Sequence, residues 1–343
     1  MRRAVWQNGL RAVKLMRVLP IGMAAAEARP KGGPRLVHSL AATLLTLVIL
    51  ALVLRRVPFP ALATALHDAD YRRFLALMIP NTVFYFAWDT LVLAVVIRWF
   101  HGAVPYRDLL PVRAASYVVG FFNTNLGRGA MAAYLCRRLD APFLELGSTV
   151  IFLVLTEYTQ LVLWSMLGLV GFRAEVTRSL AGVAVAVAIF WAVFFLYSKL
   201  HVTPARAIRW LAAPREWSLF RTFRLATAAR YGQIVLLRAP MFFVSLCLHY
   251  YAAHAFGIRI PFTQMLAFLP VIFMLAALPV TVGHLGTTQA AWIFFFSRYA
   301  PVPALLAFSL AAHLVFASTR ALLGAIWLPV VYADLAPAAR ASV

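Results

Sequence analysis

The sequence predicts an all-α, polytopic helical membrane protein. Hydrophobic residues make up 63% of its 343 residues and charged residues only 13%, whereas a soluble domain carries about 45–50% apolar and roughly 25% charged residues. The apolar runs are far longer than about ten residues and do not alternate, which excludes a transmembrane β-barrel. At about 20 residues per crossing, we expect about six spanning helices plus two broken segments.

The first 37 residues form a basic segment that we expect on the cytoplasmic side of the membrane. The segment is too long for the start of a cleavable signal peptide, and Trp6, Leu10 and Val13 are spaced as on one face of an interfacial helix. A second basic stretch, residues 199–230, also adjoins an apolar segment. Basic loops beside spans stay in the cytoplasm, so the net charge of +21 indicates orientation rather than nucleic-acid binding. The predicted parts are a basic N-terminal segment (1–37), a transmembrane domain (38–332) and a short tail (333–343).

Six apolar stretches have the length and composition of spanning helices. They cover residues 38–54, 74–100, 144–171, 180–200, 233–256 and 304–332. Between the first two, residues 58–73 contain a polar run and are expected to form an interfacial helix and a loop. His67 and Asp68 in that run could bind a metal ion, but a solvated turn is the simpler interpretation. We predict no metal site and no cofactor.

Two further segments, residues 111–138 and 261–299, are interrupted by glycine and polar residues at corresponding places. The first contains the sequence FFNTNLGRG at 121–129, and the second contains LPVTVGHLGTTQ at 278–289. A backbone that breaks inside hydrocarbon has no water to bond, so it persists only where protein or a wet cavity surrounds it. We therefore predict two re-entrant helical hairpins whose tips meet near the middle of the bilayer, as at the substrate site of many transporters.

The two halves of the sequence also correspond to each other. A shift of about 158 residues places 74–100 on 233–256, 111–138 on the second broken segment, and 144–171 on 304–332. With both basic segments in the cytoplasm, the matched spans run in opposite directions across the bilayer. The spacing therefore predicts an inverted repeat, a common plan among transporters, and the alternative is a coincidence of helix lengths.

Three motifs occur along the chain in a fixed order. They are the sequence NLGRGAM at residues 125–131, Glu157 in the following span, and the sequence VGHLGTTQ at 282–289. Together they resemble the flippase-like membrane domain of the lysylphosphatidylglycerol synthase family, which includes stand-alone members without the enzyme. The family pattern is roughly Pro-Gly-Arg-x-Gly-Glu, then Glu, then Pro-Gly-Gly-Leu-Gly-x-x-Glu, and the resemblance covers about residues 38–330. The chain departs from that pattern at Leu126, Met131, Val282, His284 and Gln289.

Arg128 is the candidate phosphate-binding residue, because a guanidinium at a helix break can bind phosphate in a bidentate manner. A helix that begins near Gly129 would add exposed N–H groups and the positive end of a helix dipole. Glu157 would be the counter-ion of Arg128 or a proton carrier, and the alternative is a structural pair. Asp89 and Arg320 are expected to pair structurally. The candidate substrate-binding residues are Asn125, Gly127, Arg128, Gly129, Glu157, Gly283, His284, Gly286 and Gln289.

The sequence and the resemblance favour a lipid flippase or lipid-linked transporter of the plasma (inner) membrane. Its expected partners are membrane lipids: an anionic phospholipid, an aminoacylated lipid or a polyprenyl-phosphate-linked lipid. The alternative is a non-transporting partner that scaffolds a lipid- or glycan-modifying enzyme, which the two neutral positions Met131 and Gln289 favour. We expect no enzyme activity, because neither the largest predicted loop nor the residues after Tyr332 can hold a transferase domain of at least about 50 residues.

Overall fold

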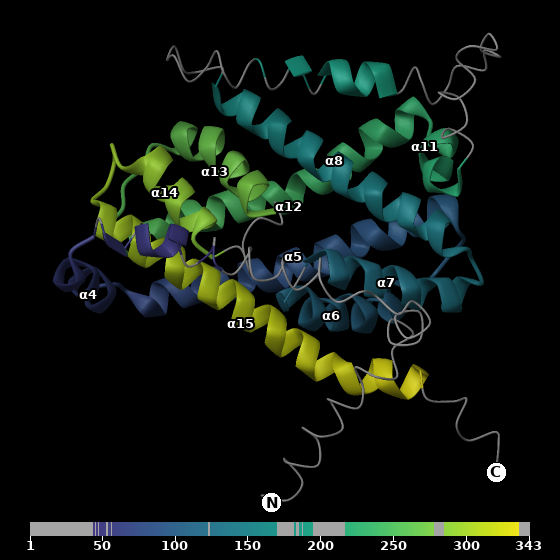
Figure 1. The fold of residues 1–343 in the computed structure, drawn as a ribbon, viewed down its shortest axis with the longest axis horizontal. Coiled ribbons are helices and arrows are strands. Elements are labelled where there is room, and N and C mark those ends of the chain that lie inside the picture. The colour runs from purple at the N-terminus through teal and green to yellow at the C-terminus, as the bar shows by residue number, and fades with distance from the viewer. Residues whose placement is uncertain are drawn as a thin grey trace, which may run out of the picture. The chain divides into compact units, whose positions relative to one another are not determined.

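The computed structural model describes residues 44, 46, 48–52, 54–55, 57–122, 124–169, 182, 185–186, 188–194, 217–277 and 285–335. Regular structure in these residues is helical, and no strand occurs among them (Figure 1). The chain separates into two compact units, Met1–Leu44 and Leu45–Val343. All the helices discussed below belong to the second unit.

Four of the helices are long and apolar enough to cross a membrane. They are α5 (Tyr71–Phe100), α8 (Phe143–Leu169), α12 (Ala228–His254) and α15 (Val302–Leu335). They correspond to the predicted spans at 74–100, 144–171, 233–256 and 304–332, so these four predictions are confirmed. Of the two other predicted spans, 38–54 and 180–200, about half of the residues are described, and those residues are helical.

Two of the long helices begin earlier than predicted because polar residues cap them. Asp70 caps α5, and its Oδ1 accepts a hydrogen bond from the backbone N–H of Arg73 at 3.0 Å. Thr227 caps α12 in the same way through the N–H of Arg230. Asp and Thr are favoured at this position because they bond an N–H group that the helix leaves free. The predicted helix and loop at 58–73 are confirmed as α4 (Phe59–His67), a bend and the start of α5.

The first broken segment consists of two helices, α6 (Tyr106–Phe122) and α7 (Thr124–Leu139). They run antiparallel, because the end of α7 contacts the start of α6: Arg138 pairs with Asp108, and Arg113 contacts Met131. The second broken segment consists of α13 (Phe262–Ala277) and α14 (Thr287–Phe296), which pack together. Figure 1 shows both pairs. Neither segment is a single continuous helix.

Gly127 allows α6 and α7 to lie in close contact. A Cβ atom on Gly127 would lie 2.6 Å from the carbonyl oxygen of Ser116 and 2.8 Å from the Cα of Gly120. Both neighbours are backbone atoms, so a side chain could be accommodated only by moving a helix. Gly129, in the same helix, has no atom within 4 Å of the corresponding position.

This contrast gives a matched pair of variants. We expect Gly127→Ala to lower the free energy of unfolding by about 1–3 kcal/mol through overpacking, and Gly129→Ala to leave it unchanged or slightly raised. Both substitutions gain the same helix propensity of about 1 kcal/mol, so their difference isolates the contact with α6. Thermal unfolding of the purified variants in detergent measures it. Equal melting temperatures would show that the close approach contributes nothing.

The helices form two sets, and the broken pair of each set packs on a long helix of the other set. The first set is α5, α6–α7 and α8, and the second is α12, α13–α14 and α15. Helix α6 packs on α15, and α13 packs on α8, while α5 packs on α12. In both of these contacts, α13 on α8 and α6 on α15, a glycine of the long helix lies against backbone atoms of the other helix. A Cβ on Gly168 of α8 would lie 2.4 Å from Ala267 N of α13, and a Cβ on Gly324 of α15 would lie 2.7 Å from Ala114 O of α6.

Two large apolar cores hold these helices together. In the first, the ring of Phe308 on α15 lies edge-on to Trp292 on α14, with centroids 4.9 Å apart. In the second, the fully buried Phe152 on α8 meets Phe223 of the short helix α11 (Arg221–Leu225) at 5.7 Å. A single 3-10 turn, η3 (Ser218–Phe220), precedes α11. These contacts fix the long helices that carry the charged residues described next.

Candidate functional site

Five charged side chains from five helices lie together among the apolar helices. Arg113 on α6 donates a hydrogen bond to Asp89 on α5. Arg238 on α12 lies between two carboxylates, with Nη2 3.9 Å from Oδ1 of Asp89 and Nη1 3.6 Å from Oε2 of Glu157 on α8. Arg128 on α7 lies 3.8 Å from the same Glu157 oxygen. The ion pairs therefore form one continuous network.

A sixth charged residue, Arg320 on α15, joins this network through an aromatic ring. Its guanidinium carbon lies 4.1 Å from the ring centroid of Phe316, 4.2 Å from that of Tyr117 and 5.3 Å from that of Tyr85. The hydroxyl of Tyr85 donates to Oε1 of Glu157 at 3.3 Å. We refer to Asp89, Arg113, Arg128, Glu157, Arg238 and Arg320 as the arginine cluster.

The predicted pairing of Asp89 with Arg320 is wrong. The ion-pair partners of Asp89 in the described part of the chain are Arg113 and Arg238. Arg320 instead lies over aromatic rings, and among the described residues no carboxylate lies within 4.0 Å of its guanidinium. Helices α6, α12 and α15 all pack on α5, but among the described residues only α6 and α12 bring an arginine within 4.0 Å of Asp89.

Burial divides the cluster into a closed part and a more open part. The side chain of Arg238 is 3% exposed and that of Asp89 is 8% exposed, whereas Arg128 is 22% and Glu157 26% exposed. The Nε atom of Arg238 is buried and has no hydrogen-bond partner among the described residues. The cluster contains four guanidinium groups and two carboxylates, so its net charge is two positive charges.

Packing next to the cluster sets the positions of its side chains. The indole N–H of Trp88 donates to the backbone carbonyl of Leu237 at 2.7 Å. These two residues directly precede Asp89 and Arg238, so the bond fixes α5 against α12 at the level of that ion pair. The close contact of Gly127 with α6 similarly places the neighbouring Arg128.

The structure brings together Arg128 of the first motif and Glu157 of the next span. The predicted helix start near Gly129 is wrong: α7 begins at Thr124, so Arg128 and Gly129 lie inside the helix. Gly127 packs the first turn of α7 against α6. Asn125 lies in this first turn, and its side chain is outside the described part of the structure.

The second motif is only partly described, since Gly283 and His284 lie outside the described residues. Gly286 has a positive φ of 87°, which glycine adopts readily. Its backbone N–H donates to Oε1 of Gln289 at 2.7 Å, and Gln289 is completely buried. Gln289 thus caps the start of α14, and this bond is local rather than directed to the arginine cluster.

Met131 stands where the family pattern places a glutamate. Its side chain is 3% exposed and belongs to the second apolar core. The Nη1 of Arg113 lies 3.5 Å from its sulfur. The neutral residue is therefore accommodated by packing between α6 and α7, and Arg113 uses Asp89 as its carboxylate.

Four members of the cluster were missed as site residues by the sequence analysis: Asp89, Arg113, Arg238 and Arg320. A signal existed for three of them, because Asp89, Arg238 and Arg320 are isolated charges inside apolar runs, where an ionisable residue is a functional candidate by default. Arg113 lies near the start of an apolar segment, where a basic residue is common. No pattern in the sequence indicated that these residues converge.

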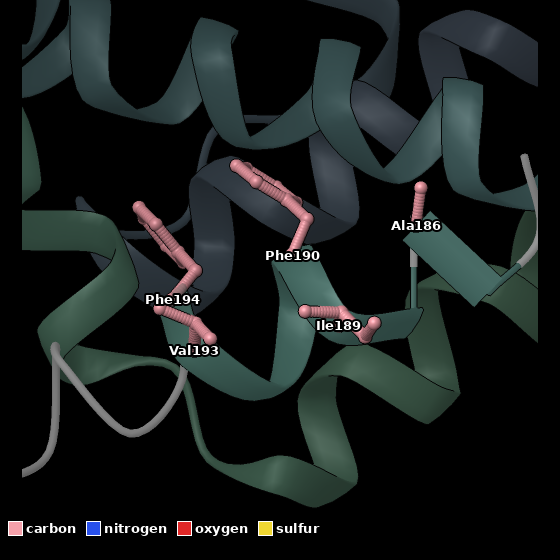
Figure 2. A pocket seen from close by; sticks show the side chains of 5 residues that line it. All are labelled: Ala186, Ile189, Phe190, Val193 and Phe194. Atoms are coloured by element: carbon pink, nitrogen blue, oxygen red, sulfur yellow. The ribbon is translucent and has the colours of Figure 1, made fainter.

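A separate hollow lies on residues 186–194, and it is apolar. Figure 2 shows its lining: Ala186, Ile189, Phe190, Val193 and Phe194. None of these side chains has a polar group that could bind a phosphate or a charged headgroup. The hollow is therefore not the candidate site, and the arginine cluster is.

Comparison with known proteins gives one family match. The model of the lysylphosphatidylglycerol synthase TM region matches residues 39–324, which is most of the chain and contains the whole arginine cluster. Comparison with curated proteins finds no match.

Proposed function

The chain belongs to the lysylphosphatidylglycerol synthase transmembrane family, and on that basis we propose that this multi-pass membrane protein is a lipid flippase or lipid-linked transporter. Its substrate is an anionic or phosphate-bearing lipid, and it is not an enzyme. The observation that carries the proposal is the Arg128–Glu157 pair, 3.8 Å apart, at the more exposed part of the arginine cluster.

The geometry of this pair suits exchange of a carboxylate for a phosphate. A separation of 3.8 Å is too long for a hydrogen bond, so the N–H groups of Arg128 are not hydrogen-bonded to Glu157 and can donate to a ligand. Glu157 also faces Arg238 at 3.6 Å and accepts a bond from Tyr85. Glu157 therefore stays neutralised when Arg128 turns to a phosphate. Without any partner, an arginine at the centre of a bilayer costs at least about 2.5–3.5 kcal/mol.

The proposed arrangement in the membrane has six spans and two re-entrant hairpins, α6–α7 and α13–α14, related by an inverted repeat. Two observations support this arrangement. Each apolar segment consists of two helices rather than one, and α6 packs on α15 of the other half as α13 packs on α8. Broken helices of this kind commonly bind substrate near the bilayer midplane. The protein resides in the plasma (inner) membrane with its N-terminus in the cytoplasm.

The orientation predicts where single cysteines can be labelled. The two native cysteines, Cys136 and Cys247, are first replaced by serine, and a single cysteine is then introduced as Arg215→Cys or Arg340→Cys. Residues 215 and 340 both lie outside the described residues. An impermeant maleimide should leave both cysteines unlabelled in intact cells and should label both after permeabilisation, because basic loops stay in the cytoplasm. Labelling of either from outside would overturn the topology and with it the inverted repeat.

Transport is tested with the purified protein in liposomes that contain fluorescent lipids of different headgroups. Loss of fluorescence after addition of a membrane-impermeant reductant reports the lipids that reach the outer leaflet. We expect accelerated exchange of at least one phosphate-bearing lipid among phosphatidylglycerol, lysyl-phosphatidylglycerol, phosphatidate and polyprenyl phosphate. A zwitterionic lipid of the same chain length is the control. Exchange of all of these at the protein-free rate would contradict the proposal.

A second candidate function is supported by the two neutral motif positions. Met131 packs in an apolar core and Gln289 caps a helix, so neither supplies the carboxylate that the family pattern has there. A membrane scaffold for a lipid- or glycan-modifying enzyme needs no such carboxylates. Absence of transport, together with loss of a modified lipid or glycan in cells lacking the protein, would favour this function.

A further inference from the structure

Building on the proposed transport function, we propose that the arginine cluster selects a headgroup with a terminal phosphate, a phosphomonoester that carries two negative charges. Arg128 and Arg320 are the two residues that bind it. A phosphodiester headgroup such as phosphatidylglycerol carries one negative charge and would be the poorer substrate.

The charges of the cluster provide the first argument. Arg113 neutralises Asp89 through a direct hydrogen bond, and Arg238 lies between Asp89 and Glu157 and neutralises the latter. Arg128 shares the carboxylate of Glu157 with Arg238, and Arg320 has no carboxylate within 4.0 Å among the described residues. Charges inside a membrane protein are normally paired, so the excess of two positive charges in the cluster calls for a ligand with two negative charges.

The surroundings of Arg320 provide the second argument. Aromatic rings lie over its guanidinium, with Phe316 and Tyr117 about equally close at 4.1 and 4.2 Å. Stacking holds the plane of the group while leaving its N–H edges free to donate. The Nε atom is buried without a hydrogen-bond partner in the described part of the chain. An arginine whose plane is held by aromatic rings and whose Nε has no partner among the described residues is suited to bidentate binding of phosphate oxygens.

Tyr85 links the two arginines and provides the third argument. Its ring lies beside Arg320 at 5.3 Å, and its hydroxyl donates to Glu157, the partner of Arg128. Arg128 and Arg320 are thus linked through one carboxylate and one tyrosine. The buried Nε of Arg238 is a further donor without a partner in the described residues.

The test compares two lipids with identical acyl chains and label, phosphatidate and phosphatidylglycerol, in liposomes containing the purified protein. At pH 7.5 we expect phosphatidate to be transported about tenfold faster, the effect of one additional charge-assisted hydrogen bond. The second ionisation of a phosphomonoester has a pKa of about 6, so the preference should disappear at pH 5. Protein-free liposomes correct for spontaneous movement at each pH, and labelled polyprenyl phosphate should behave as phosphatidate does.

Variants assign the preference to Arg320. Arg320→Gln should bring the ratio of the two rates close to one, whereas Arg298→Gln, at an exposed arginine outside the cluster, should keep the wild-type ratio. If Arg320→Gln does not fold, Arg320→Lys keeps the charge but loses the planar group, and a reduced ratio is expected from it too. An unchanged ratio in the folded variant would overturn the role of Arg320.

The outcomes separate this inference from the proposed function. Equal or faster transport of phosphatidylglycerol by the wild type would overturn the preference and leave the flippase function standing. Transport of none of the lipids would overturn both. Inorganic phosphate at millimolar concentration should compete only weakly, and complete inhibition without a preference between lipids would assign the site to soluble phosphate instead.

Discussion

Arg128→Gln is expected to reduce lipid transport to the protein-free rate, and Arg128→Lys to reduce it about tenfold. Glutamine removes the charge that binds the phosphate. Lysine keeps a charge but lacks the planar fork of N–H groups that binds phosphate in a bidentate manner, and one lost charge-assisted hydrogen bond corresponds to about a factor of ten. The measurement is the rate of lipid exchange in the liposome assay, normalised to the amount of folded protein.

The neighbours of Arg128 make this prediction specific to binding. Glu157 retains Arg238 at 3.6 Å and Tyr85 at 3.3 Å, so the variants do not leave a carboxylate without a partner. They should therefore fold and insert as the wild type does, which melting temperature and gel filtration would show. Arg298→Gln is the control for loss of one positive charge. Wild-type transport by both Arg128 variants would make the arginine structural and would favour the scaffold function.

Asp89→Asn is expected to lower the free energy of unfolding by about 3–5 kcal/mol, the range found when one partner of a buried ion pair is removed. Asp89 is 8% exposed and faces both Arg113 and Arg238. Among the described residues, its loss leaves Arg113 with the sulfur of Met131 and the ring of Tyr117 as side-chain neighbours and with no carboxylate within 4.0 Å. Thermal or denaturant unfolding in detergent measures the change.

Two further variants show whether the effect comes from the unpaired charge. In Asp89→Asn/Arg113→Gln the unpaired cation is removed as well, so the double variant should be more stable than Asp89→Asn alone. Asp108→Asn disrupts the partly exposed pair with Arg138, whose side chains are 35–37% exposed, and should cost no more than about 1 kcal/mol. Equal losses for Asp89→Asn and Asp108→Asn would mean that burial does not matter at this pair.

The sequence alone was sufficient for the class of protein and for the positions of four spans. Hydropathy and length are properties of a contiguous stretch, and a bilayer imposes one length on every crossing helix. The two interrupted segments were also visible, because glycine and polar residues interrupt apolar runs in 121–129 and 278–289. Helix starts were less accurate: Asp70 and Thr227 extend α5 and α12 by capping, which hydropathy does not register.

Within the candidate site, the sequence indicated Arg128 and Glu157 because an ionisable residue inside an apolar run has few explanations other than a partner or a ligand. The start of α7 was misplaced for a different reason. Glycine usually signals a break, but at Gly127 the missing side chain lets α6 approach to within backbone contact. The contact stabilises the helix, and the break therefore comes earlier, before Thr124.

By itself, the sequence determined that this chain is a helical membrane protein with two interrupted segments and a few intramembrane charges. Only the tertiary structure decided which charges meet: Asp89 with Arg113 and Arg238, Glu157 with Arg128 and Arg238, and Arg320 with aromatic rings. The pairing depends on how six helices, α5 to α8, α12 and α15, are rotated and packed against one another. That rotation is set by backbone contacts at glycines and by bonds such as Trp88 to Leu237, whose partners no local pattern identifies.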